Sequence, residues 1–286
     1  MKQNEVELLA SYWTLSGGAI PHSEAEYSTF EFKERVEAAA RAGFKGMGFW
    51  HADLEHVRQR RSFAEMKRIL EANGIEHIEL EFLVDWFLDG ERRQQSDKRR
   101  AMLLEAAETL GARHIKVGDF FGTRCPMPRL IEEFGALCRE AEARGTKIVY
   151  EMMPFSAIDS LEGSRDLVVG AAAKNGGIIF DLWHIVKLGI SYANVMRFPS
   201  QYFLGLEIND GYLKAPAGMD LVEETTGHRK LCGDGEFDIR GFLAMLPQSG
   251  YRGPVGIEVL NRELRTWPLE AATTTAYRTT LAQFPA

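Results

Sequence analysis

The stretch DKRRAMLLEAAETLGARHIKVGD, residues 97–119, decides the fold. Its first part places apolar residues three and four positions apart, as an amphipathic helix does, and residues 114–118 then have the composition of a short strand. Between the two lies Gly111, where a left-handed residue is expected to end the helix. The same order of helix, glycine and strand occurs at Gly43, Gly74 and Gly145, so the chain repeats a βα unit.

Eight segments have the length and composition of strands, and helical segments separate them. The predicted strands cover residues 6–13, 46–50, 75–82, 114–118, 147–152, 177–181, 203–209 and 255–260. This alternation predicts a parallel sheet, and eight units suit a single (β/α)₈ barrel domain over residues 1–286. An open, doubly wound sheet uses the same units, but neither nucleotide motif, GxGxxG or GxxxxGK[ST], is present.

Composition restricts the classes of partner. The 286 residues are 45% hydrophobic and 26% charged, which is typical of a soluble globular protein. The net charge of -7 disfavours binding to nucleic acid, and no apolar run approaches the roughly 18 residues of a membrane span. Cys125, Cys138 and Cys232 form no CxxC motif, and the N-terminus does not resemble a signal peptide. We therefore expect a cytoplasmic protein without nucleic-acid or membrane partners.

Four carboxylates interrupt apolar strands near their C-terminal ends, where barrel enzymes carry their chemistry. They are Glu151 in KIVYEMMP, Asp181 in GIIFDLWH, Glu207 in FLGLEIND and Glu258 in VGIEVLN. Acids gathered in one lumen repel each other unless counter-charges are present, and either a divalent cation or neighbouring Lys and Arg side chains can supply these. We expect one divalent ion. All-oxygen ligands favour Mg²⁺ or Mn²⁺, although Zn²⁺ stays open because His184 and His228 lie nearby in the sequence.

At these residues the chain resembles the xylose-isomerase-like barrel superfamily. The resemblance is strongest in its second half, which includes Asp181-Leu-Trp-His184, Glu207-Ile-Asn-Asp210, His228-Arg229 and Gly256-Ile-Glu258. The superfamily includes sugar isomerases, ketose 3-epimerases, inosose and dehydroshikimate dehydratases, and enzymes of the endonuclease IV type. The resemblance therefore implies a barrel that binds a metal and acts on a sugar or polyol.

The resemblance also implies roles for individual residues. Glu151 and Glu258 would be both metal ligands and the acid/base pair, Asp181 would be a ligand, and His184 and Arg229 would bind substrate oxygens. Glu207 stands where the epimerase branch usually has a histidine ligand, and Gly48 stands where a glutamate is common.

Further residues are candidates for contact with the substrate. Trp13 and His51 fall near strand ends, Lys116 lies in the fourth strand, and His228 lies in the loop before Arg229. Aromatic side chains such as Trp13 are equally compatible with plain packing.

Such a site predicts an isomerase or epimerase that acts on a hydroxy-ketone sugar or polyol through an enediolate. With the same residues, a dehydratase or lyase that expels a leaving group is the alternative. The acidic composition disfavours an endonuclease of the endonuclease IV type, and a non-catalytic sugar-binding subunit is a further alternative. Related barrels often pair, which makes a homodimer an expectation for the assembly.

Overall fold

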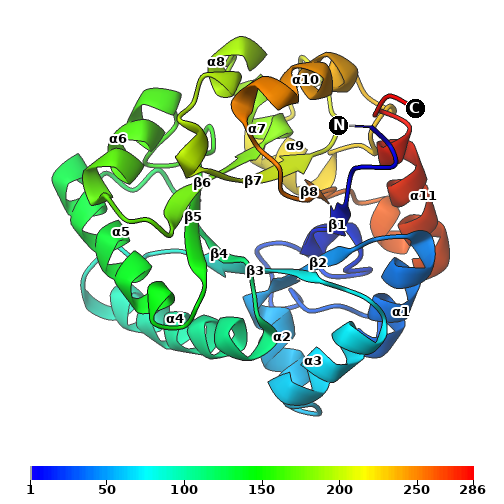
Figure 1. The fold of residues 1–286 in the computed structure, drawn as a ribbon, viewed down its shortest axis with the longest axis horizontal. Coiled ribbons are helices and arrows are strands. Elements are labelled where there is room, and N and C mark those ends of the chain that lie inside the picture. The colour runs from blue at the N-terminus through cyan, green and yellow to red at the C-terminus, as the bar shows by residue number, and fades with distance from the viewer. Residues whose placement is uncertain (1) are drawn as a thin grey trace.

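The computed structural model describes residues 2–286 and has eight parallel strands that close into a barrel in chain order (Figure 1). The strands are β1 (Leu8–Ala10), β2 (Gly46–Trp50), β3 (His77–Leu83), β4 (His114–Val117), β5 (Lys147–Glu151), β6 (Gly176–Asp181), β7 (Phe203–Ile208) and β8 (Val255–Ile257). Pairing of β1 with β8 closes the ring, which confirms the predicted (β/α)₈ fold.

Helices surround the strands on the outside of the barrel (Figure 1). The α-helices are α1 (Phe32–Ala42), α2 (His51–Arg58), α3 (Phe63–Ala72), α4 (Gly90–Leu110), α5 (Met127–Glu142), α6 (Leu161–Ala171), α7 (Leu182–Lys187), α8 (Tyr192–Met196), α9 (Leu221–Gly227), α10 (Ile239–Met245) and α11 (Leu269–Leu281). Short 3₁₀ turns are η1 (Tyr12–Thr14), η2 (Ser200–Tyr202), η3 (Leu246–Ser249) and η4 (Leu264–Thr266). Within residues 2–286, no helix combines the length and the apolarity needed to cross a bilayer.

The ends of the first and last strands differ from the prediction. The strand predicted over 6–13 covers only Leu8–Ala10, and the one predicted over 255–260 stops at Ile257. The side chain of Thr14 lies at the C-terminal ends of both strands, where its Oγ1 donates to the Ile257 carbonyl and accepts from the Val259 amide. A hydroxyl thus takes the place of the next ladder bonds, and Glu258 lies just beyond β8 rather than inside it.

The predicted glycines all have left-handed backbone conformations, but only two are the C-cap itself. Gly43 follows α1 and Gly111 follows α4 with φ values of 110° and 73°. Gly74 and Gly145 have φ values of 66° and 71°, and each comes after a short extension of the preceding helix. The glycines therefore reverse the chain toward the next strand in all four units.

Two apolar clusters divide the interior. The larger cluster fills the space between strands and helices, where Leu80, Ile115 and Phe180 are buried. The smaller one, which we call the mouth cluster, lies near the C-terminal ends of the strands. Its buried members are Tyr12, Trp13, Ala19, Trp50, Phe82, Met153 and Leu260. The mouth cluster borders the end of the barrel where the strand-end acids lie.

A buried ion pair holds the loop between β1 and α1. Arg35 Nη2 lies 2.6 Å from Asp53 Oδ2, and the two side chains are only 2% and 1% exposed. The other oxygen of Asp53 accepts a hydrogen bond of 2.9 Å from the amide of Ser28. The pair therefore connects α1, α2 and the loop that leads from η1.

Replacing Arg35 by methionine should lower the free energy of unfolding by about 3–5 kcal/mol, because the Asp53 carboxylate would stay buried without its partner. Urea denaturation followed by circular dichroism measures the loss. Arg41→Met is the control, since Arg41 and Glu270 pair on the surface with 57% and 58% of their side chains exposed. Equal losses in the two variants would contradict this account of the buried pair.

Candidate active site

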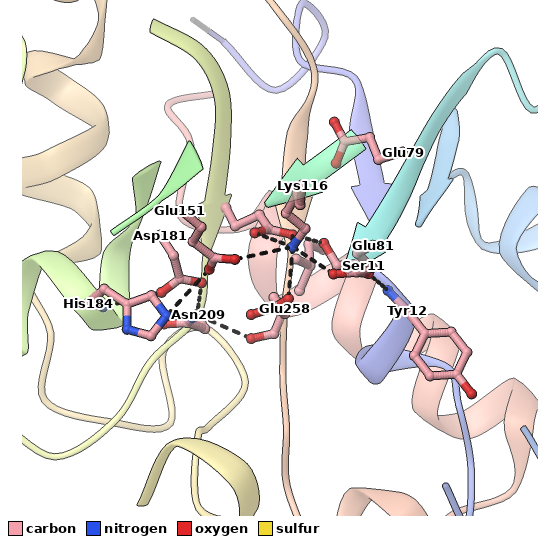
Figure 2. A network of polar contacts seen from close by, with 12 residues as sticks. Ser11, Tyr12, Glu79, Glu81, Lys116, Glu151, Asp181, His184, Asn209 and Glu258 are labelled. Carbon is pink, nitrogen blue, oxygen red and sulfur yellow. Dashed lines mark hydrogen bonds and ion pairs between the residues drawn. The ribbon is translucent and has the colours of Figure 1, made fainter. Parts of the chain in front are cut away.

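The barrel brings the four predicted carboxylates together at one place (Figure 2). Glu151 ends β5, Asp181 ends β6, Glu207 is the last but one residue of β7, and Glu258 directly follows β8. One oxygen from each lies within 4.8 Å of the others, and all four side chains are buried. Strand register explains the convergence, because Asp181 pairs with Glu207, and Glu207 with Gly256. We call these residues the strand-end acids.

Lys116 of β4 reaches into the centre of this group (Figure 2). Its Nζ lies 2.8 Å from an oxygen of Glu207, 2.8 Å from Glu81, 3.1 Å from Glu258 and 3.9 Å from Glu151. Burial alone would lower the pKa of Lys116, but the surrounding carboxylates raise it well above its ordinary value. The predicted role of Lys116 in substrate contact does not fit this position, because the side chain is fully buried and occupied by carboxylates.

Arg229 provides the second internal cation. Its Nη1 lies 2.9 Å from Asp181 Oδ2 and 2.7 Å from Glu258 Oε2. Its Nε and Nη2 donate to Thr225 Oγ1 at 3.0 Å and 2.8 Å, and Nη2 also lies 3.3 Å from His184 Nε2. The guanidinium therefore holds Asp181 and Glu258 in place, whereas the resemblance implies that it binds substrate.

Three residues of the site did not stand out in the sequence. Glu81 on β3 accepts from the Tyr12 amide at 3.1 Å and pairs with Lys116. Asn209 Nδ2 donates to Asp181 Oδ2 at 3.0 Å, and Ser11 donates a short hydrogen bond to Glu207. Only Glu81 carries a detectable signal, since it interrupts the apolar strand HIELEFL in the way the four predicted acids interrupt theirs.

Carboxylates outnumber cations in the lumen. We use the name lumen acids for Glu81 together with the four strand-end acids. Lys116 and Arg229 are the cations that pair with these five carboxylates, so full ionisation leaves three surplus negative charges. Burial raises the pKa of Glu81 to about 7 and that of Glu207 well above its ordinary value. The lumen therefore has an unmet demand for positive charge.

A divalent cation fits this demand. It would neutralise two of the three surplus charges, and the strand-end acids form a buried acidic cluster with oxygens close enough together to bind it. Among Glu81, Glu151 and Glu207, Glu151 loses its proton most readily. Burial opposes its ionisation, but Lys116, His184 and Arg229 outweigh that effect and lower its pKa to about 2. The donor set consists of carboxylate oxygens, the ligands that hard divalent ions prefer.

His184 lies between this cluster and the open mouth of the barrel. The Asp181 carboxylate caps α7 by accepting from the amides of Trp183 and His184, which orients the first turn of the helix. The Nε2 of His184 lies 3.3 Å from Glu151 Oε1, and the ring lines the pocket. His184 is therefore positioned to contact both Glu151 and a bound molecule.

Aromatic residues line much of the pocket above the acids. It encloses about 600 Å³ of empty space, including its open mouth. Glu81, Glu151 and Glu258 lie at the acidic side of the pocket, and the aromatic residues that line it are Trp13, Trp50, Phe82, Phe120 and Phe155. Trp13 lies in η1 and lines this pocket, and its contact with a substrate stays a prediction.

Two predicted histidines lie elsewhere. His51 is buried at the start of α2, and its Nδ1 accepts from the Phe82 amide at 3.4 Å. Burial and Arg99 lower the pKa of His51 to about 3, so the ring is neutral at ordinary pH. His228 lines a separate groove with Arg262 and Trp267. Neither histidine is among the residues that line the aromatic pocket, and we assign neither a part in substrate binding.

Comparisons with known proteins agree with this architecture. The chain is 29% identical over 244 residues to a 3-dehydroshikimate dehydratase of Pseudomonas aeruginosa, which covers 83% of this chain but only 37% of that protein. It is 24% identical over 187 residues to an inosose isomerase of Bacillus velezensis, covering 63% of this chain and 65% of the relative. The chain thus spans little more than a third of the dehydratase that it matches.

Solved structures show the same fold. The crystal structure of the IolI protein with a bound zinc atom superposes with a TM-score of 0.82 at 18% identity, and the match covers 97% of both chains. The family model described as xylose isomerase-like TIM barrel matches residues 36–281. Because this match extends from α1 to the last residue of α11, the chain belongs to the xylose isomerase-like TIM barrel family.

Proposed function

We propose that this protein is a divalent-metal-dependent isomerase or epimerase that acts on a hydroxy-ketone sugar or polyol. One observation carries the proposal: of the four strand-end acids, Glu151 and Glu258 line the pocket, whereas Asp181 and Glu207 lie behind them. Two of the strand-end acids would thus face a bound molecule, one from the end of β5 and one from just after β8. An isomerase or epimerase needs such a pair, because one group removes a proton and another returns it.

The strand-end acids would hold the ion, and Mn²⁺ or Mg²⁺ suits their oxygen ligands best. When bound, such an ion polarises a substrate carbonyl and acidifies the neighbouring C–H bond. Glu207 would be a constrained ligand, since Lys116 and Ser11 already contact its oxygens.

The residues around the pair prepare it for proton transfer. The low pKa of Glu151, about 2, keeps this carboxylate ionised at neutral pH; because so acidic a group is a weak base, its removal of a proton depends on the bound ion acidifying the C–H bond. Arg229 fixes Glu258 at 2.7 Å, and His184 fixes Glu151 at 3.3 Å, so both carboxylates are oriented before substrate arrives. In our proposal Glu151 takes the proton next to the carbonyl, and Glu258 delivers one to the opposite face or to the adjacent carbon.

A dehydratase or lyase is the second candidate, and the position of His184 supports it. The ring lines the pocket beside Glu151 and can protonate a departing hydroxyl after the same proton abstraction. The similarity to a 3-dehydroshikimate dehydratase points in the same direction.

Isothermal titration of the chelator-treated protein with Mn²⁺ should show one ion bound per chain. Asp181→Asn should weaken binding by about tenfold or more, because it removes a charged oxygen ligand without changing the size of the side chain. Asp89→Asn is the matched control, since Asp89 pairs with Arg129 on the surface. Unchanged affinity in Asp181→Asn would refute the assignment of the ligands.

Glu151→Gln and Glu258→Gln should each lower turnover by about 10²- to 10⁴-fold, because an amide neither accepts nor returns the proton. Deuterium incorporation from D₂O into keto-sugars and keto-polyols, followed by NMR, measures the proton transfer directly. Glu105→Gln, on the exposed face of α4, should keep the wild-type rate. Full exchange in both pocket variants would sink the proposed acid/base pair.

The mass of the product separates the two candidate reactions. An isomerase or epimerase leaves the mass unchanged, whereas a dehydratase lowers it by one water. If the protein is an isomerase, His184→Asn should retain deuterium exchange at the reacting carbon and yield a product of the same mass. The dehydratase would instead be established if the wild type removes water from the substrate and His184→Asn does not, while deuterium exchange persists in the variant.

A further inference from the structure

Aromatic rings form one apolar part of the pocket lining. The rings of Phe82 and Phe120 are stacked with their centroids 4.7 Å apart and planes 29° apart. Trp50 lies 6.1 Å from Phe82 and 6.5 Å from Phe120, at interplanar angles of 28° and 24°. The three rings thus have similar orientations and line the same pocket, and we call them the aromatic wall. Such a surface suits the C–H face of a ring, because aromatic faces bury apolar area with little loss of side-chain freedom.

Carboxylates in the same lining offer acceptors of hydrogen bonds. Glu81, Glu151 and Glu258 line the pocket from the lumen, and Glu26 lines it beside the aromatic wall, where its carboxylate accepts from Trp50 Nε1 at 3.0 Å. Carboxylates accept hydrogen bonds from hydroxyl groups, so this lining suits a polyol. Aromatic rings and carboxylates together favour a molecule that carries hydroxyls and also has a C–H face.

The pocket has no cation to spare for an anionic group. Among the lining residues in the described chain, 2–286, Arg229 is the only Lys or Arg. Its Nη1 already pairs with Asp181 and Glu258, and its Nε and Nη2 donate to Thr225. Lys116 is fully buried beneath the pocket among carboxylates. A phosphate or carboxylate on the substrate would therefore lack the paired Arg or Lys donors that anion sites require.

We propose that the substrate is an uncharged ring, a cyclic keto-polyol or the ring form of a keto-sugar, which lies with its C–H face on the aromatic wall and is neither phosphorylated nor carboxylated. This inference rests on the proposed function for the reacting carbonyl, but it concerns recognition and not turnover. The inference distinguishes the substrates named for the similar dehydratase and isomerase, because dehydroshikimate carries a carboxylate and an inosose does not.

Binding to the Mn²⁺-loaded protein, measured by calorimetry and by the fluorescence of Trp13 and Trp50 in the pocket, tests the inference. The probes form matched pairs: 3-dehydroshikimate and its methyl ester, D-fructose and D-fructose 1-phosphate, and 2-keto-myo-inositol with a monophosphate of it. In at least one pair the uncharged member should bind at least about tenfold more tightly, a difference of about 1.4 kcal/mol. Tighter binding of the charged members, or no binding of any uncharged ring, would overturn the inference.

Phe120→Ala tests the aromatic wall, because Phe120 is only partly buried and its loss should leave the fold intact. It should weaken binding of the uncharged ring by about tenfold, since stacking on one aromatic face contributes about 1–3 kcal/mol. Phe120→Leu keeps the apolar bulk without the flat face and should lie between the wild type and Phe120→Ala. Unchanged affinity in both variants would overturn the stacking.

These outcomes remain separable from those of the proposed function. Tight binding of uncharged rings without deuterium exchange would refute the isomerase and keep the substrate class. Turnover of a phosphorylated or carboxylated substrate would keep the isomerase and refute the substrate class.

Discussion

An excess of buried negative charge is the constraint on which the rest of this site depends. Five carboxylates project into the lumen, and the two cations that pair with them leave three charges unmatched. Ionised carboxylates are expensive to bury without partners, so the sequence must supply protons, further cations or a metal ion. The raised pKa values of Glu81 and Glu207 show the same demand, because burial among other carboxylates favours their neutral, protonated forms. A divalent ion meets it with the ligands already in place.

The lumen and the mouth divide recognition between them. Below, Lys116 and Arg229 hold the acids in fixed positions by direct ion pairs, so that the carboxylates facing the pocket are oriented in advance. Above, Trp50, Phe82 and Phe120 form an apolar wall. In our proposal the chemistry takes place at the strand ends, while aromatic residues at the mouth select the shape and polarity of the substrate.

Much of this arrangement can be predicted from the sequence, because a barrel follows from repeated βα units and the reacting groups follow from polar residues at strand ends. Glu151, Asp181 and Glu207 illustrate the rule, since each interrupts an apolar run and all three meet in the lumen. The same rule applies to Glu81, which was missed because its strand also carries Glu79 and so looks less apolar.

Other features depend on packing that a single sequence does not encode in any short pattern. Lys116 looks like a polar residue at a strand end, but its partners come from β3, β5, β7 and the end of β8. His228 precedes Arg229 directly, yet the two side chains line different cavities. The C-terminal ends of β1 and β8 were predicted too far along the chain, because the hydroxyl of Thr14 replaces the next ladder bonds between them.

Anomalous diffraction from crystals grown with Mn²⁺ tests the central claim most directly. We predict one manganese peak among the carboxylates of Glu151, Asp181, Glu207 and Glu258, within bonding distance of their oxygens. The absence of any manganese peak in the lumen, with Lys116 and Arg229 keeping all their present ion pairs, would contradict the account.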